Sequence, residues 1–87
     1  MNLLKKTFIG LLQHQSIVAV KGLVKGGKLT KDVPVDLESE LASMKKQIES
    51  SPESIGMLVQ LEITDDDLRG VIKKAVEKCE LKVKIQP

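Results

Sequence analysis

The last third of the chain, residues 54–87, changes its apolar period twice, and this constrains the fold more than any other stretch. Over 55–63, apolar residues alternate with other residues, which predicts a strand with one buried face. Over 68–79, apolar residues recur every three or four positions, which is the period of a helix. The alternation returns over 81–85. The pattern therefore predicts a strand, a helix and a second strand.

Charged residues at both ends support the predicted helix. Thr64 or Asp65 can cap its start, and the aspartates at 65–67 place negative charge where the helix dipole favours it. Lysines at 73, 74 and 78 lie towards the other end, where positive charge is favoured. Consecutive side chains on a helix point about 100° apart, so the three aspartates cannot converge on one ion. We therefore expect a capping role, with no metal and no cofactor.

The first residues, 1–13, are predicted to form an amphipathic helix, with a strand over 7–13 as the alternative. On a helix, one face would carry Leu4, Phe8, Leu11 and Leu12. Such a face must pack on the core, on a membrane surface or on a second subunit. Two lysines, Lys5 and Lys6, are too few to favour a membrane. We therefore expect this segment to pack on the core or to form a dimer interface.

The middle of the chain is predicted to form a β-hairpin followed by a helix. The β-branched residues of 16–24 favour a strand, and the sequence Lys-Gly-Gly-Lys at 25–28 favours a turn. Residues 29–35 favour a second, weaker strand. A helix is then predicted to begin at Asp36 and to end before Pro52, because proline disfavours helix in the residue before it.

Together these elements predict an α/β (α+β) two-layer sandwich in the order α-β-β-α-β-α-β. The chain of 87 residues is expected to form one domain, residues 1–87, with a small aliphatic core because Phe8 is its only aromatic residue. Residues that alternate with the apolar ones would line the other face of the sheet: Gln60, Glu62, Lys82 and Lys84. One face of the sheet should therefore be open to water or to a partner.

The composition limits the cellular setting. Cys79 is the only cysteine, so no disulfide can form within the chain, and its place on the apolar stripe predicts a buried thiol. No apolar run approaches the roughly 18 residues that a membrane-spanning helix needs. We expect a cytoplasmic protein that does not bind membranes.

Residues 22–28 match the first part of a phosphate-binding loop, G-x-x-x-x-G-K. Leu29 stands where such a loop has Ser or Thr to hold magnesium, and no helix is expected to follow. We therefore interpret the glycines as the hairpin turn.

Lysines form a second candidate binding surface. Residues 1–35 hold six lysines against Asp32, a net charge of +5, whereas residues 36–87 have a net charge of −3. The hairpin 21–31 and the last strand would present Lys21, Lys25, Lys28, Lys31, Lys82 and Lys84. Such a patch could follow the phosphates of a nucleic acid. Because the sheet lacks aromatic residues for base stacking, any binding should be weak, salt-sensitive and independent of base sequence.

No set of nucleophile, base and orienting group can be assembled, and His14 is the only histidine. The sequence therefore predicts a small non-enzymatic protein-interaction or assembly module that pairs with itself as a homodimer, or with another protein. An accessory nucleic-acid-binding protein is the alternative, and a small enzyme is a minor one.

Overall fold

The computed structural model describes residues 3–84, and helices dominate this part of the chain. They are α1 (Leu3–Lys25), α2 (Leu37–Glu49), α3 (Pro52–Gln60) and α4 (Asp65–Lys78). Within residues 3–84 the only β pairing is a single parallel bridge between Val35 and Val83. The predicted α/β sandwich is therefore wrong, and the protein is a helical bundle.

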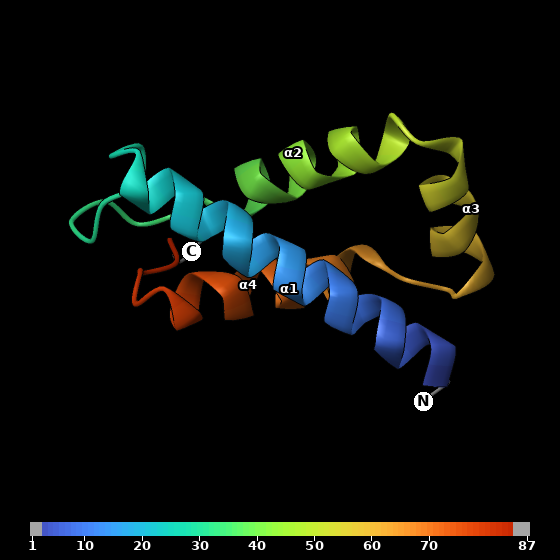
Figure 1. Ribbon diagram of the computed structural model, residues 1–87. Coiled ribbons are helices and arrows are strands. Elements are labelled where there is room, and N and C mark those ends of the chain that lie inside the picture. Colours follow the sequence, from blue (N-terminus) through green and yellow to red (C-terminus); the bar gives the residue numbers. More distant parts are fainter. Residues whose placement is uncertain (1–2, 85–87) are drawn as a thin grey trace.

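The central element of the bundle is α4, and both α1 and α2 pack along it (Figure 1). Near their first turns, α1 and α4 are joined by Lys5 and Asp67, whose charged atoms lie 3.2 Å apart. Near their last turns, Lys25 and Cys79 line one shallow pocket. The two helices therefore run in the same direction, while α2 runs the opposite way and α3 connects its end to the start of α4 (Figure 1).

The core lies along one face of α4. This face carries five buried residues at spacings of three and four: Leu68, Val71, Ile72, Ala75 and Val76. They pack against buried residues from the other elements, Val20, Val35, Leu41 and Leu81. The predicted helix over this stretch is confirmed. Cys79, expected to be buried, is half-buried because it follows the last turn of the helix.

The predicted strand over 55–63 is instead largely the helix α3. Ser51 caps its start by accepting a hydrogen bond from the backbone N–H of Ser54, and Pro52 occupies the first turn. Leu58 is half-buried and Leu61 is buried, whereas Val59 is 76% exposed. The apolar residues that alternate in the sequence therefore do not share a buried face.

The predicted hairpin is also wrong, because residues 16–24 continue α1. Valine and isoleucine cost less than about 1 kcal/mol each in a helix. Packing of Ile17 and Val20 on the core outweighs that cost. Residues 29–35 form a loop, and the only β pairing in this loop is the bridge between Val35 and Val83. The last predicted strand is reduced to this bridge within the described residues, and Ile85 and Gln86 lie outside them.

Three of the four helices end in the same backbone motif. After α1, the N–H of Lys28 donates to the carbonyl of Leu23 over 2.9 Å, and Gly27 has φ +77°. Corresponding hydrogen bonds close α3 and α4, where the left-handed position is held by Glu62 (φ 54°) and Glu80 (φ 60°). This is the Schellman motif, in which glycine is the usual residue. The Gly-Gly pair therefore ends a helix and makes no hairpin turn.

Two further predicted helices are confirmed in part. The segment 3–13 is helical, which excludes the strand alternative over 7–13, but it is only the first half of α1. Residues 1 and 2 lie outside the described part. The helix predicted from Asp36 is α2, and the Asp36 side chain accepts a hydrogen bond from the backbone N–H of Ser39 as its cap.

Candidate protein-interaction surface

Helix α1 carries apolar residues around most of its circumference but buries little of them. Within the described residues 3–84, Val20 is the only residue of α1 that is buried. Several large side chains of α1 are more than half exposed: Leu3, Leu4, Leu11 and Val18. A helix that is apolar all round is normally covered on all sides. The exposed part of α1 is therefore the first candidate for a binding surface.

Polar contacts fix the rotation of α1 on α4. Gln13 Nε2 donates a hydrogen bond of 2.8 Å to the carbonyl of Val71. One turn from the N-terminal end, Lys5 Nζ contacts Asp67 Oδ2 at 3.2 Å and donates to the carbonyl of Glu62 at 3.1 Å. These contacts hold one face of α1 on α4 and determine which residues of α1 face outward.

The outward side of α1 bears a stripe with a seven-residue spacing, formed by Leu4, Leu11 and Val18 and called here the outer stripe. Their exposed fractions are 66%, 59% and 57%. Seven residues are nearly two helical turns, so the three side chains lie almost in line along the helix. The outer stripe is therefore a narrow apolar line on the exposed side of α1.

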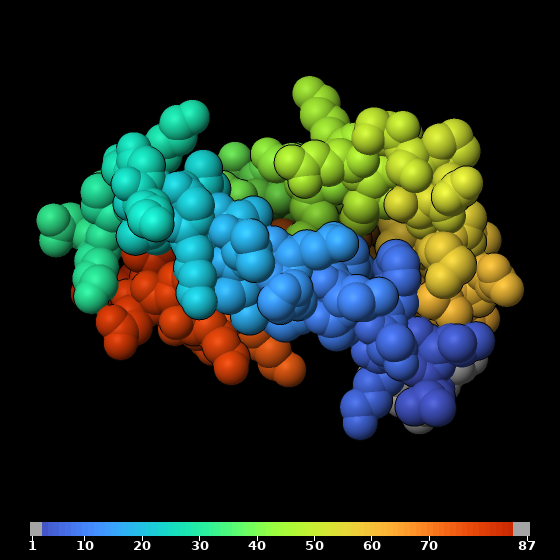
Figure 2. All heavy atoms as spheres, in the orientation of Figure 1, coloured from blue at the N-terminus to red at the C-terminus, as the bar shows by residue number. Residues whose placement is uncertain are grey.

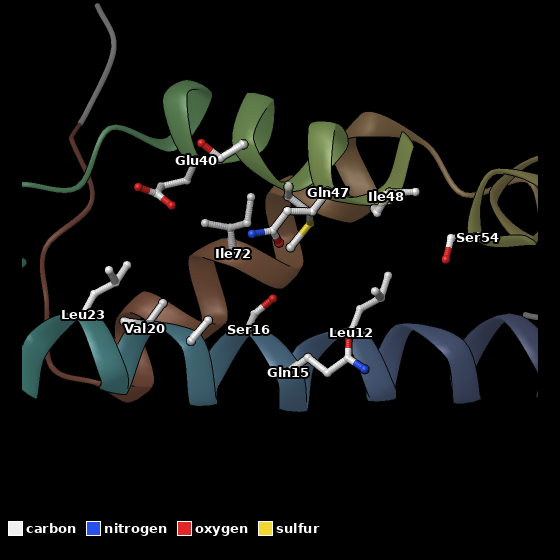
Figure 3. A pocket seen from close by; sticks show the side chains of 13 residues that line it. Leu12, Gln15, Ser16, Val20, Leu23, Glu40, Gln47, Ile48, Ser54 and Ile72 are labelled. Carbon is white, nitrogen blue, oxygen red and sulfur yellow. The ribbon is translucent and has the colours of Figure 1, made fainter. Parts of the chain in front are cut away.

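A groove of about 480 Å³ lies beside the outer stripe, between α1 and α2 (Figures 2 and 3). Ile72 of α4 forms its floor, Leu12 and Leu23 line the α1 side, and Met44 and Ile48 line the α2 side. Polar residues also line it: Gln15, Ser16, Glu40, Ser43, Gln47 and Ser54. The groove therefore has a mixed lining of apolar and polar side chains.

The four residues predicted for partner binding do not all lie on one exposed surface. Leu4 and Leu11 are exposed on the outer stripe, whereas Phe8 is half-buried. Leu12 is half-buried, packs against the core and lines the groove. Val18 was missed because 16–24 was assigned to a strand; its distance of seven positions from Leu11 is the signal that would have found it.

The lysines proposed for nucleic-acid binding gather at one end of the molecule, called here the lysine end. The C-terminal ends of α1 and α4 lie there with the loop after α1 (Figure 1). Lys31 Nζ contacts Glu80 Oε2 at 3.3 Å, and the Val35–Val83 bridge brings the last described residues to the same loop. All six are exposed: Lys21, Lys25, Lys28, Lys31, Lys82 and Lys84.

The three aspartates at the start of α4 contact three different cations. Asp65 contacts Lys45 at 3.3 Å, Asp66 contacts Arg69, and Asp67 contacts Lys5. The hydrogen bond from the backbone N–H of Thr64, together with Lys5, holds the pKa of Asp67 below its ordinary value. The predicted capping role is confirmed for Asp67, which forms a capping box with Thr64.

Two observations concern other site classes. Among residues 3–84, no three His, Cys, Asp or Glu side chains are grouped so that they could hold a metal ion. The helices of this part of the chain are also too short or too polar to cross a membrane.

The sequence matches no protein-family model, and comparisons with curated proteins and with solved structures also find no match. The function must therefore be argued from the outer stripe, the groove and the lysine end.

Proposed function

We propose that the protein is a non-enzymatic assembly module that forms a homodimer through the exposed side of α1. The observation that carries this proposal is the outer stripe. Leu11 and Val18 are 59% and 57% exposed at a seven-residue spacing, on a helix whose opposite face is held on α4. A two-fold dimer pairs one surface with itself, and a second copy of the stripe would offer apolar side chains of the same kind.

The size of the domain adds a reason to associate. A chain of 87 residues has a small core, and the described buried residues are aliphatic. Burying a fully exposed leucine or valine side chain contributes about 1.5–3 kcal/mol. Association itself costs at least about 4 kcal/mol in lost freedom. The outer stripe alone therefore gives a weak dimer, and a stable one must extend over the neighbouring surface.

The test is to place a charge on the outer stripe. Leu11→Glu and Val18→Glu each put a carboxylate into the proposed interface but only into solvent in the monomer. Both variants should change the solution mass from dimer to monomer in light scattering, while the helical circular dichroism stays the same.

The matched controls are Val33→Glu and Val59→Glu, which alter residues that are 63% and 76% exposed but lie outside α1. Both should remain dimeric. A wild-type protein that is monomeric at high concentration would reject the proposal. So would a Leu11→Glu variant that is unfolded, because Leu11 would then belong to the core.

Nucleic-acid binding is the second candidate, supported by the exposed lysines at the lysine end. The C-terminal ends of α1 and α4 lie at the same place, and their dipoles put partial negative charge there. Lysines in this position stabilise the helix ends, and the same dipoles weaken the attraction for phosphates. Fluorescence anisotropy with labelled DNA at about 50 mM and about 200 mM salt tests this candidate. Binding that Lys28→Glu abolishes would favour it.

A further inference from the structure

We infer that α1 also binds the surface of an anionic lipid bilayer, lying along it with the outer stripe among the lipid headgroups. This inference goes beyond the proposed homodimer and does not depend on it. A partner for the exposed side of α1 must supply apolar contact for leucine and valine, and negative charge for the lysines around them. A bilayer that contains anionic lipids supplies both on one surface.

The apolar part of this surface lies on the exposed side of α1. Leu11 and Val18 are 59% and 57% exposed, and Leu3 at the first turn is 76% exposed. The other side of the helix is packed on the core and joined to α4 through Gln13. Helix α1 runs across the front of the molecule in Figure 2. It can therefore place its outer stripe against a surface while its packing on α4 stays intact.

The charge of α1 is positive along its whole length. Residues 1–31 contain no aspartate or glutamate, and Asp32 is the first acidic residue of the chain. Lys6 lies near the start of α1 and Lys21 and Lys25 near its end, and all three are exposed. Lysines therefore stand at both ends of the outer stripe. Each lysine near an anionic bilayer strengthens binding.

Helix α4 adds two lysines beside α1. Asp67 of α4 contacts Lys5 of α1, so this side of α4 faces α1. Lys74 and Lys78 follow Asp67 by seven and eleven positions, which places them nearly in line with it along the helix. Both are exposed. They extend the positive charge along the flank of α1.

These lysines change the argument that the sequence allowed. The segment 1–13 contains two lysines, which are too few to favour a membrane. The structure extends the helix to Lys25 and places part of α4 beside it. The exposed lysines on or beside α1 are therefore Lys6, Lys21, Lys25, Lys74 and Lys78.

The combination of features favours lipid over the other partners considered for this protein. A nucleic acid offers phosphates but leaves Leu11 and Val18 in water. A second copy offers apolar contact but carries the same positive charge, which weakens self-association. The outer stripe is shared, so a chain on the bilayer contacts lipid there in place of a second copy.

Co-sedimentation with vesicles tests the inference. The full-length protein is mixed with sucrose-loaded vesicles of phosphatidylcholine that contain about one-third phosphatidylglycerol. Vesicles of pure phosphatidylcholine are the reference. The ratio of bound to free protein should be at least about tenfold higher on the anionic vesicles. It should fall towards the reference value when salt is raised from about 0.1 M to about 0.5 M.

The lysines are tested by removing their charge. The double variant Lys21→Gln with Lys25→Gln should lower the ratio of bound to free protein about tenfold. The control is Lys46→Gln with Lys73→Gln, which removes the same charge elsewhere. Lys46 lies on α2, and Lys73 follows by four positions Arg69, which contacts α2. The control should stay within about threefold of the wild type.

The outer stripe is tested by Leu11→Gln, which removes apolar contact and keeps the charge. It should lower the ratio of bound to free protein about five- to tenfold. The same substitution weakens the homodimer, but that effect alone would free the stripe and raise the ratio. A fall therefore reports lost contact with lipid. Val59→Gln on α3, at a position that is 76% exposed, is the control and should stay within about twofold.

Three results would overturn the inference. The first is no binding to anionic vesicles, and the second is equal binding to both kinds of vesicle. The third is binding that the lysine variant loses and Leu11→Gln keeps, because charge alone would then suffice and a nucleic acid would serve as well. A dimer in light scattering without vesicle binding would leave the proposed function standing. Vesicle binding by a protein that is always monomeric would reject only the homodimer.

Discussion

Gln13 of α1 donates its side-chain amide to the backbone carbonyl of Val71 in α4, with 2.8 Å between nitrogen and oxygen. The contact joins the middle of α1 to the middle of the central helix. Together with the Lys5 contacts and the packing of Ile17 and Val20 on the core, it holds one side of α1 on α4. Leu11 and Val18 lie on the exposed side, and the proposed interface depends on this arrangement.

Gln13→Ala should lower the free energy of unfolding by about 0.5–1.5 kcal/mol, the net value of a typical hydrogen bond. Urea denaturation of the variant, made in the Leu11→Glu background to exclude dimerisation, measures it. Gln15→Ala on the same helix is the control, since Gln15 is exposed, and it should change stability by less than about 0.5 kcal/mol. Equal losses would mean that α1 is rotated relative to the arrangement described.

Asp67 should make stability sensitive to acid. The N–H of Thr64 donates to its carboxylate over 2.9 Å and Lys5 lies 3.2 Å away, so its pKa in the folded state is below its ordinary value. A lowered pKa stabilises the folded state above the unfolded pKa, and this contribution is lost as the pH falls through the folded pKa. Urea midpoints should therefore fall from about pH 4 downward, and Asp67→Asn should fall less steeply.

Thr64→Ala is the control for this titration. It removes the hydroxyl that caps Asp67 N–H and should cost about 0.5–2 kcal/mol. It also removes one of the smaller causes that lower the pKa of Asp67, but it keeps the backbone N–H, which is the largest. Its stability should therefore be lower at every pH, and it should keep most of the acid dependence that Asp67→Asn loses. An Asp67→Asn variant with the wild-type acid dependence would exclude Asp67 as the responsible group.

Glu62→Gly should stabilise the protein, which is unusual for a substitution by glycine. Glu62 follows α3 with φ 54°, a conformation that costs a residue with a Cβ atom about 1–2 kcal/mol. The expected gain is about 0.5–1 kcal/mol in thermal or urea denaturation, after the greater freedom of unfolded glycine is included. Lys73→Gly, an exposed position inside α4, should instead lose about 1 kcal/mol. A loss at both positions would show that Glu62 is not strained.

Local signals made two helices predictable. Asp36 caps α2 and Thr64 caps α4, and both helices carry acidic residues in the first turn and a lysine in the last. These signals act within a few residues, so the sequence displays them directly. The core face of α4 was predictable for the same reason, because its apolar residues keep one helical period without interruption.

Tertiary packing decided the elements that the sequence patterns got wrong. The β-branched residues at 17, 18 and 20 favour a strand locally, but α1 gains its stability from α4, which lies far along the chain. The alternating pattern over 55–63 treated Val59 and Leu61 as equivalent, although only Leu61 is buried. The groove could not be predicted from the periodicity of the sequence, because it exists only where α1 and α2 pack on the same third helix, α4.

This difference gives a decisive comparison between Val76→Asp and Val59→Asp. A strand over 55–63 predicts that both substitutions unfold the domain. Val76 is 0% exposed, so an unpaired carboxylate there should cost several kcal/mol and unfold the protein. Val59 is 76% exposed, so Val59→Asp should remain folded and stay within about 0.5 kcal/mol of the wild type. Circular dichroism melts that show two unfolded variants would restore the strand.

The thermal stability of the full-length protein should depend on its concentration. A dimer that forms only from folded chains stabilises the folded state by mass action. When dimer dominates, each tenfold rise in concentration adds about 1.4 kcal/mol per dimer, or about 0.7 kcal/mol per chain. For a domain of this size, that shifts the melting temperature by about 3–5 °C.

The Leu11→Glu variant should melt at one temperature across the same concentration range, because its chains stay apart. It should also melt below the wild type wherever the wild type is dimeric, since it lacks the stabilisation from association. If wild type and variant both melt independently of concentration, the exposed stripe on α1 does not join two copies of this chain. The apolar surface would then require a partner other than a second copy.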